Sequence, residues 1–277
     1  IWVKLLSNAI LQRNPDYVSL VQITDLHLFS DTNKSIHGVN TQSSFDAVLS
    51  VATQVFDSPD LMLFTGDLYH EPSTDNYDRL FDTLTQTNIP YVAMAGNHDV
   101  TLELDEHLPF HRRRHLPVEV DARLIGCACL ELAHWDVLLL DTSCAGQVYG
   151  KLSACALDWL AKNLAASVRP CVIFCHHPMV SVNSQWIDAH MLANADDFWQ
   201  VVAPHQQRLK GIFVGHIHQE MQVIKHEVPV FGCPSTGVQF KPFCKDYTID
   251  CCPPGLRWIN LYNNGLLATG IKRIDTM

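Results

Sequence analysis

The chain has 277 residues, of which 47% are hydrophobic, and its net charge is −10 at pH 7. This length and apolar content suffice for a substantial core, and no stretch approaches 18 consecutive apolar residues, so the composition predicts no membrane-spanning helix. Nucleic-acid-binding proteins normally present a basic face, and the acidic balance therefore argues against nuclease action on long polymers. The compact basic cluster, HRRRH at 111–115, is predicted to be a solvated loop, with a local anion site as the alternative.

The beginning of the chain, IWVKLLSNAIL, is apolar but is interrupted by Lys4 and Asn8, and no small-residue cleavage site follows it. It is therefore predicted to be a first structural element and not a signal peptide. The ten cysteines show no C-x-x-C spacing, which argues against a zinc ribbon. Cys171 and Cys175 lie inside an apolar run, where cysteine behaves as a small hydrophobic residue. We expect a reduced, cytoplasmic protein.

Apolar runs and helical patterns alternate along the chain from residue 17. The predicted buried strands are 17–23, 60–65, 91–95, 136–141, 171–175 and 211–215. The predicted helices are 43–56, 76–88, 153–167 and 194–205, and short antiparallel strands are expected at 227–233, 255–262 and 266–274. This alternation is typical of α/β proteins whose sheets are covered on their faces. We expect a single domain over residues 1–277.

Side chains of the types that bind metals directly follow five of these strands. They are Asp25 and His27 after 17–23, Asp67 after 60–65, Asn97, His98 and Asp99 after 91–95, His176 and His177 after 171–175, and His216 and His218 after 211–215. In open α/β sheets, ligands bind at the carboxyl ends of the strands. Each motif alone is common in turns and surface loops, but five in succession predict one shared site.

The chemistry of these side chains fits two metal ions. One ion is expected to bind Asp25, His27 and His218, the other Asn97, His176 and His216, with Asp67 bridging both. Residues two apart point to the same side of an extended chain, so Asp25 and His27 can hold one ion together. Mixed nitrogen and oxygen ligands suit Mn, Fe, Co or Zn. Two divalent cations and two carboxylates leave a surplus of two positive charges, which suits a hydroxide and a phosphodiester anion.

The motifs D-x-H, G-D, G-N-H-D, H and G-H-x-H, in this order, resemble those of the calcineurin-like metallophosphoesterase superfamily. The stretches VQITDLHLF, GVNTQSSFDAVL and CPSTGVQFKPFC resemble more closely its bacterial class III 3′,5′-cyclic AMP phosphodiesterases. The resemblance runs from about residue 17 to residue 274. It implies an α/β fold of two packed mixed β-sheets flanked by helices in four layers. It also implies a dinuclear centre of two divalent ions or an Fe³⁺/divalent pair, with Fe or Mn preferred and Zn or Co as alternatives.

The resemblance also implies a reaction. Cyclic AMP would be hydrolysed to 5′-AMP by in-line attack of a metal-bound hydroxide. His98, next to Asn97, is expected to protonate the leaving O3′ or to stabilise the phosphoryl charge, and Asp99 to orient or charge it. His177 is expected to contact the metal ligands without binding a metal ion itself. The substrate is expected to contact His27, Asn97, His98 and His218.

The features that decide the substrate are less distinct. The segments 29–41 and 234–242 are expected to frame the nucleoside, and the candidates for contact are His37, Asn40, Thr236 and Gln239, each equally open to a structural role. Other readings are a phosphodiesterase for a 2′,3′-cyclic nucleotide, a glycerophosphodiester or a nucleotide-sugar, a non-catalytic scaffold, and a structural zinc protein. A scaffold usually loses ligands, and structural zinc needs closed Cys-rich sites. The expected partner is a small cyclic nucleotide, without nucleic acid or membrane, and the protein is expected to be a monomer or a homodimer.

Overall fold

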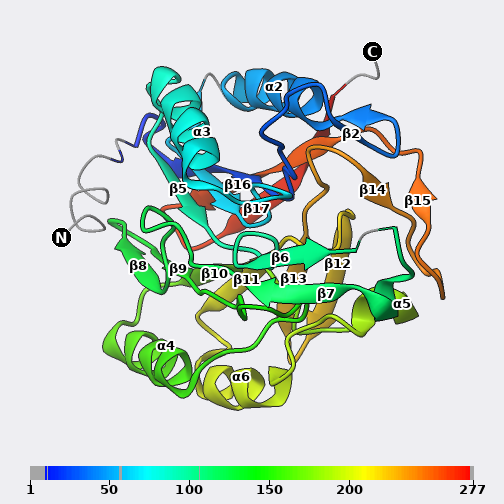
Figure 1. Ribbon diagram of the computed structural model, residues 1–277. Coiled ribbons are helices and arrows are strands. Elements are labelled where there is room, and N and C mark those ends of the chain that lie inside the picture. Colours follow the sequence, from blue (N-terminus) through cyan, green and yellow to red (C-terminus); the bar gives the residue numbers. More distant parts are fainter. Residues whose placement is uncertain (1–9, 11, 56–57, 106, 275–277) are drawn as a thin grey trace.

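The computed structural model describes residues 10, 12–55, 58–105 and 107–274, so the element predicted at 1–11 lies almost wholly outside the described residues. Two β-sheets lie at the centre of the molecule (Figure 1). The first has the order β17-β16-β1-β4-β5, with strands at Leu267–Arg273, Gly255–Tyr262, Tyr17–Ile23, Leu61–Thr65 and Tyr91–Met94. The second has the order β12-β13-β11-β10-β9-β8, with strands at Met221–Lys225, Val228–Gly232, Leu209–Val214, Cys171–Cys175, Asp136–Leu139 and Ala128–Glu131.

Both sheets are mixed, but their central strands are parallel. β1, β4 and β5 run parallel in the first sheet, and β9, β10, β11 and β13 run parallel in the second. The segment 227–233, expected to be antiparallel, pairs antiparallel with β12 but parallel with β11. Because parallel strands end at the same edge, the side chains that follow β1, β4 and β5, and those that follow β10 and β11, are gathered in two neighbouring rows.

The sheets pack face to face because their strands carry apolar side chains on both sides. In β10, Val172 and Phe174 enter the core between the sheets, whereas Ile173 and Cys175 enter the core beneath the helices. Phe174 stacks on Phe213 of β11 with ring centroids 4.8 Å apart. The same alternation in β1 and β4 divides their apolar side chains between the core between the sheets and the core beneath α2 and α3.

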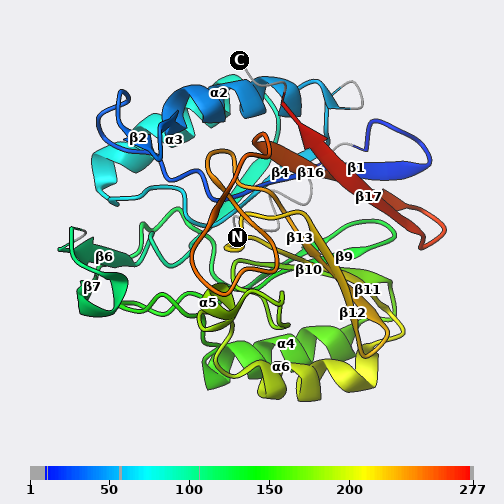
Figure 2. The ribbon, with the colours of Figure 1, turned by 90° about the vertical axis from the view of Figure 1, so that its right-hand side faces the viewer.

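Helices cover the two outer faces of the paired sheets (Figure 2). α2 (Thr41–Ala52) and α3 (Thr74–Gln86) lie on the first sheet, and α4 (Ala154–Ala166) and α6 (Ala195–Val202) on the second. Asn40 begins α2, since its side chain accepts a hydrogen bond from the Ser43 N–H, and Ser153 begins α4 in the same way. The four layers confirm the fold class predicted from the sequence.

Short elements that the sequence did not predict surround one edge of the sheets. They are β2 (Ser35–Ile36), β3 (Val39–Asn40), β6 (Thr101–Leu104), β7 (Arg114–Pro117), β14 (Gln239–Phe240), β15 (Ile249–Asp250) and the short helix α5 (Gln185–Asp188).

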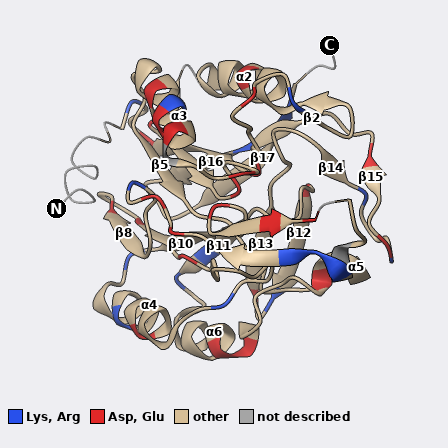
Figure 3. Cartoon of the chain, in the orientation of Figure 1, with Lys and Arg blue, Asp and Glu red and all other residues tan. Residues whose placement is uncertain are grey.

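The basic cluster at 111–115 is largely exposed to solvent, as predicted, but it lies in a short 3-10 helix and at the start of β7 and not in a loop (Figure 3). Arg113 pairs with Glu103 at 2.5 Å and Arg114 with Asp105 at 2.7 Å. These carboxylates offset the local positive charge.

All ten cysteines lie in the described part of the chain, and all are free thiols. Burial raises the pKa of Cys175, the last residue of β10, to about 12, so this thiol stays protonated. None of the helices in the described ranges combines the length and the apolar character that crossing a bilayer requires.

Candidate metal centre

The seven side chains expected to bind metal lie together where the two sheets meet at their carboxyl edges. They are Asp25, His27, Asp67, Asn97, His176, His216 and His218, and all are buried. The apolar residue between each D-x-H or H-x-H pair anchors its loop, since Leu26 and Ile217 are fully buried in the cores beneath. The motif positions thus follow from the strand ends that precede them.

The backbone around these side chains is not extended, which corrects the expectation of a shared strand face. Asp25, His27, Asp67, His216 and His218 all have positive φ values, between 45° and 66°. This left-handed region costs a non-glycine residue roughly 1–2 kcal/mol. Because the chain turns at each of these positions, no strand face is shared: Asp25 and His27 still join one group of donor atoms, whereas His216 and His218 join different groups. Such strain gathers at functional sites.

Two glycines allow the loops to approach one another closely. A Cβ on Gly96 would lie 2.2 Å from Asp67 Oδ1 and 2.8 Å from His176 Cε1. Gly66, with φ +100°, would place a Cβ 2.5 Å from His176 Nδ1. Any side chain at these positions would push the first sheet's loops away from His176 on the second sheet.

The first donor set consists of Asp25, His27 and His218, with Asp67 beside it. His27 Nε2 lies 3.2 Å from His218 Nε2, and His218 Nε2 lies 3.3 Å from Asp25 Oδ1. Asp67 Oδ2 lies 3.7 Å from His27 Nε2.

The second donor set consists of Asn97, His176 and His216, again with Asp67 beside it. Asn97 Oδ1 lies 3.0 Å from His216 Nδ1 and 3.3 Å from His176 Nε2. Asp67 Oδ2, the same atom as before, lies 3.4 Å from His176 Nε2. A single carboxylate oxygen therefore belongs to both sets.

These separations fit metal coordination. Ligand atoms about 2.1 Å from one ion and about 90–110° apart lie about 3.0–3.5 Å from one another. The donors also have the mixed imidazole, carboxylate and amide character that borderline divalent metals accept. The residues present therefore fit two ions that share Asp67.

In His176 and His218, the ring nitrogen that points away from the donor sets contacts a backbone carbonyl oxygen. His176 Nδ1 lies 2.8 Å from the Thr65 carbonyl oxygen, and His218 Nδ1 lies 2.7 Å from that of Val238. Such contacts fix the tautomer and leave the opposite nitrogen to bind a metal. Both ring nitrogens of His177 have other partners: the Thr142 hydroxyl lies at 2.9 Å and the Val148 carbonyl at 3.2 Å.

The charges of the site also favour cations. Burial, with the neighbouring rings, holds the pKa of His27 and of His216 well below the usual value, so both rings are neutral and able to act as ligands. Burial opposes protonation of His176 as well, but the Asp67 and Asp25 carboxylates raise its pKa to about 9. Positive charge between the sheets therefore stabilises the two buried carboxylates.

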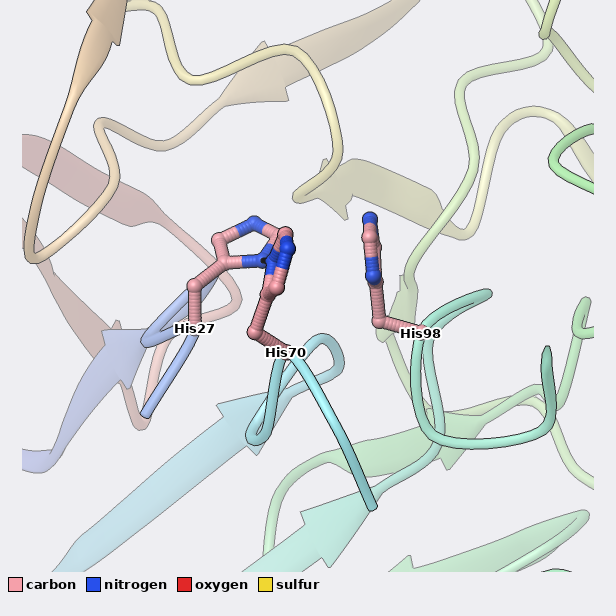
Figure 4. A group of neighbouring side chains, drawn as sticks. All are labelled: His27, His70 and His98. Atoms are coloured by element: carbon pink, nitrogen blue, oxygen red, sulfur yellow. Dashed lines mark hydrogen bonds between the residues drawn. The ribbon is translucent and has the colours of Figure 1, made fainter. Parts of the chain in front are cut away.

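A third histidine cluster lies beside the first donor set. His27, His70 and His98 come from the loops after β1, β4 and β5, and their rings converge (Figure 4). His70 Nδ1 lies 3.5 Å from His27 Nδ1, and the His70 and His98 rings stack with centroids 4.8 Å apart. His70 was not predicted from the sequence, although its place three residues after Asp67 in GDLYH was a usable signal.

Asp99 does not have the contacts expected of a group that orients His98. Its carboxylate accepts hydrogen bonds from the backbone N–H groups of Gly96, Leu68 and Tyr69 and from the Tyr77 hydroxyl, the last at 2.6 Å. Burial and the nearby Asp67 raise the pKa of Asp99 to about 6. These contacts tie the loop after β4 to the loop after β5, which is a structural role.

A cavity of about 630 Å³ opens over the donor sets. The four residues expected to contact substrate all line it: His27, Asn97, His98 and His218. His37 lines it too, whereas Asn40 caps α2 and Gln239 donates its amide hydrogens to backbone carbonyls of Ser235 and Gly237. Thr236 is fully buried.

Comparison with known proteins identifies the family. The profile of the Calcineurin-like phosphoesterase family matches residues 18–220. The chain belongs to this family. It is accordingly a metal-dependent hydrolase, which confirms the class of enzyme predicted from the motifs.

Curated members of the calcineurin-like phosphoesterase family match most of the chain. A "Probable cyclic nucleotide phosphodiesterase" of Psychrobacter arcticus is 41% identical over 265 residues, which cover 94% of this chain and 95% of that protein. The "3′,5′-cyclic adenosine monophosphate phosphodiesterase CpdA" of Haemophilus influenzae is 36% identical over 270 residues and covers 96% and 93%. A solved dimetal phosphatase from Danio rerio has the same fold, with a TM-score of 0.56, 13% identity and coverage of 92% and 98%.

The close approach at Gly96 generates a test. We expect Gly96→Ala to displace Asp67 and His176, so that the purified variant holds less metal and loses most hydrolase activity. Gly126→Ala is the matched control, because a Cβ there meets nothing within 4 Å. Metal analysis by mass spectrometry checks both variants, and a Gly96→Ala protein with normal metal content would contradict the packing described here.

Proposed function

We propose that this protein hydrolyses 3′,5′-cyclic AMP to 5′-AMP at a dinuclear metal centre. The observation that carries the chemistry is the arrangement of two donor sets that share Asp67 Oδ2. The substrate is supported by the relatives named cyclic nucleotide phosphodiesterases, each of which aligns over more than nine-tenths of this chain. We also place the reaction in the cytoplasm, in keeping with the ten unpaired thiols.

Asp25, His27 and His218 would hold one ion, and Asn97, His176 and His216 the other, with Asp67 bridging. Iron or manganese is the preferred pair, with zinc or cobalt as alternatives. When bound, the ions supply Lewis-acid activation of water and neutralise the phosphodiester charge. Water attacks phosphorus in line, the P–O3′ bond breaks, and the leaving oxygen takes up a proton.

His98 is our candidate for the proton donor. Its ring lines the cavity and forms a hydrogen bond to the backbone of His70. Its backbone N–H donates to Asp67 Oδ1 at 2.8 Å, which fixes it beside the shared carboxylate. The T-shaped contact with His27, at 4.8 Å between centroids, sets the ring at the edge of the first donor set.

The substrate is tested with purified protein and added Mn²⁺. We expect the highest kcat/KM for cyclic AMP among cyclic AMP, cyclic GMP, 2′,3′-cyclic AMP and bis(p-nitrophenyl) phosphate, with 5′-AMP as the product. Chelation should abolish the activity and Mn²⁺ should restore it. A preference for 2′,3′-cyclic AMP would favour the alternative small diesters, and inactivity on all four substrates would favour a non-catalytic scaffold.

The shared role of Asp67 is tested by metal content. Asp67→Ala removes an oxygen from both donor sets, so we expect the loss of both ions, whereas Asn97→Ala should mainly weaken one. Asp60→Ala is the matched control: Asp60 is an equally buried carboxylate, but it precedes β4 and binds the Ser19 N–H at 2.8 Å. Two ions retained in Asp67→Ala would rule out bridging.

The role of His98 is tested with two leaving groups. A ribose 3′-alkoxide needs a proton to leave, whereas nitrophenolate does not. General acid catalysis contributes a factor of about 10²–10⁴, so His98→Ala should lose activity on cyclic AMP by roughly that factor and lose much less on bis(p-nitrophenyl) phosphate. Metal content measured on the same sample should be normal. Equal losses on both substrates would instead indicate stabilisation of the phosphoryl charge.

A further inference from the structure

Three aromatic side chains form one side of the cavity and are called here the aromatic wall: Trp186 of α5, Phe240 of β14 and Tyr247 from the loop after β14. The centroid of the Trp186 ring lies 4.8 Å from that of Phe240 and 4.9 Å from that of Tyr247. The Phe240 and Tyr247 centroids lie 5.3 Å apart. The interplanar angles, between 63° and 78°, are typical of edge-to-face aromatic packing. The three rings therefore support one another as a unit.

The aromatic wall is continuous with the first donor set. Phe240 stacks on His218, with centroids 4.0 Å apart and planes 10° apart. Trp186 and Tyr247 pack on Phe240 and are thus separated from His218 by one ring. A ligand whose phosphate occupies the donor sets would thus meet aromatic surface about one ring-width beyond the phosphate.

At the end farthest from the donor sets, the aromatic wall contacts a residue from the opposite side of the cavity. The Tyr247 hydroxyl lies 3.0 Å from His37 Nε2, in the turn between β2 and β3. This contact joins a loop that follows the second sheet to one that follows the first. The aliphatic residues Ile36, Ile187 and Val238 also line this part of the cavity.

The cavity is larger than a phosphate group needs and has the size and character of a small-molecule site. Its volume, about 630 Å³, falls within the range of about 300–1,000 Å³ usual for such sites. Its metal-binding donors are gathered at one end, whereas the aromatic wall and the aliphatic residues line the other, together with the ion pair of Arg113 and Glu103. The second part of the ligand should therefore be flat and apolar on its faces.

We propose that the aromatic wall binds the nucleobase of the nucleotide whose phosphate occupies the donor sets. The inference rests on the proposed function and adds to it the residues that recognise the base. Every base has a π-face, so stacking on Trp186 and Tyr247 favours nucleotides over glycerophosphodiesters and other aliphatic esters. The His218–Phe240 stack would then fix the distance between the phosphate and base positions.

The wall has a second conceivable role, which is only to support His218. Tyr247 separates the two roles, because it packs on Phe240 and Trp186 while His218 stacks on Phe240 alone among the three rings. A purely supporting wall would change metal content and the affinity for every phosphate ligand together. A base-binding wall changes only the affinity for ligands that carry a base.

The test compares two ligands that differ only in the base. Isothermal titration calorimetry measures binding of 5′-AMP and of ribose 5-phosphate to the Mn²⁺-loaded protein. We expect 5′-AMP to bind more tightly, and Tyr247→Ala and Trp186→Ala to weaken it by about 5- to 150-fold, the range of measured base stacking. The affinity for ribose 5-phosphate and the metal content should stay unchanged.

Phe243→Ala is the matched control, because Phe243 is an aromatic residue of the same loop that is 77% exposed and outside the cavity lining. It should bind both ligands normally. Equal affinities for 5′-AMP and ribose 5-phosphate in the unchanged protein would overturn the inference. An equal weakening of the affinity for both ligands in Tyr247→Ala would also overturn it. If cyclic AMP is not hydrolysed but the difference between the ligands persists and depends on Tyr247, the proposed substrate fails while the base-binding wall stands.

Discussion

Two buried carboxylates held beside one amide and four histidines are the constraint on which this structure depends. Asp25 and Asp67 are 0% and 2% exposed, and charges this deeply buried are costly unless opposite charge accompanies them. The fold meets this requirement by placing histidines from the second sheet against acids from the first. His216 N–H donates to both oxygens of Asp25, and His176 lies against Asp67. The site is thus an interface between sheets, and neither sheet contains it alone.

The interface requires unusual backbone at each strand end. Left-handed residues turn the chain so that side chains on loops of one sheet reach those of the other, and glycines at 66 and 96 permit contact where a Cβ could not fit. The conformational cost is offset by the pairing around it: Asp25 N–H bonds to Gly66 O, and His27 N–H bonds to Asp67 O, each at 3.0 Å. These bonds continue the β1–β4 pairing past the end of the regular strands, which makes the donor positions rigid.

The sequence predicted the site better than its surroundings. Apolar strands followed by acids, histidines and one asparagine predicted the seven side chains that the structure brings together, because strand ends of parallel sheets must gather at one edge. The left-handed turns at Asp25 and His218 were not predictable, since Asp and His adopt that conformation more often than most residues but still only in a minority of cases. The aromatic wall was also missed: Trp186 and Phe240 are 54 positions apart, and only the packing of α5 against β14 brings them together. The hairpin of β6 and β7 was missed because RHLP lacks an alternating apolar pattern.

The place of β1 in its sheet has a consequence for how the protein forms during synthesis. β1 pairs with β4 on one side and with β16 on the other, so residues 17–23 lie beside residues 257–262. When a ribosome has made the chain as far as residue 200, β1 has an open edge, and the His216 and His218 partners of its loop do not yet exist. Such long-range pairing slows folding and prolongs the exposure of apolar strand edges. The nascent chain therefore depends on late completion by β16, and truncation before that strand should leave an aggregation-prone product without a metal centre.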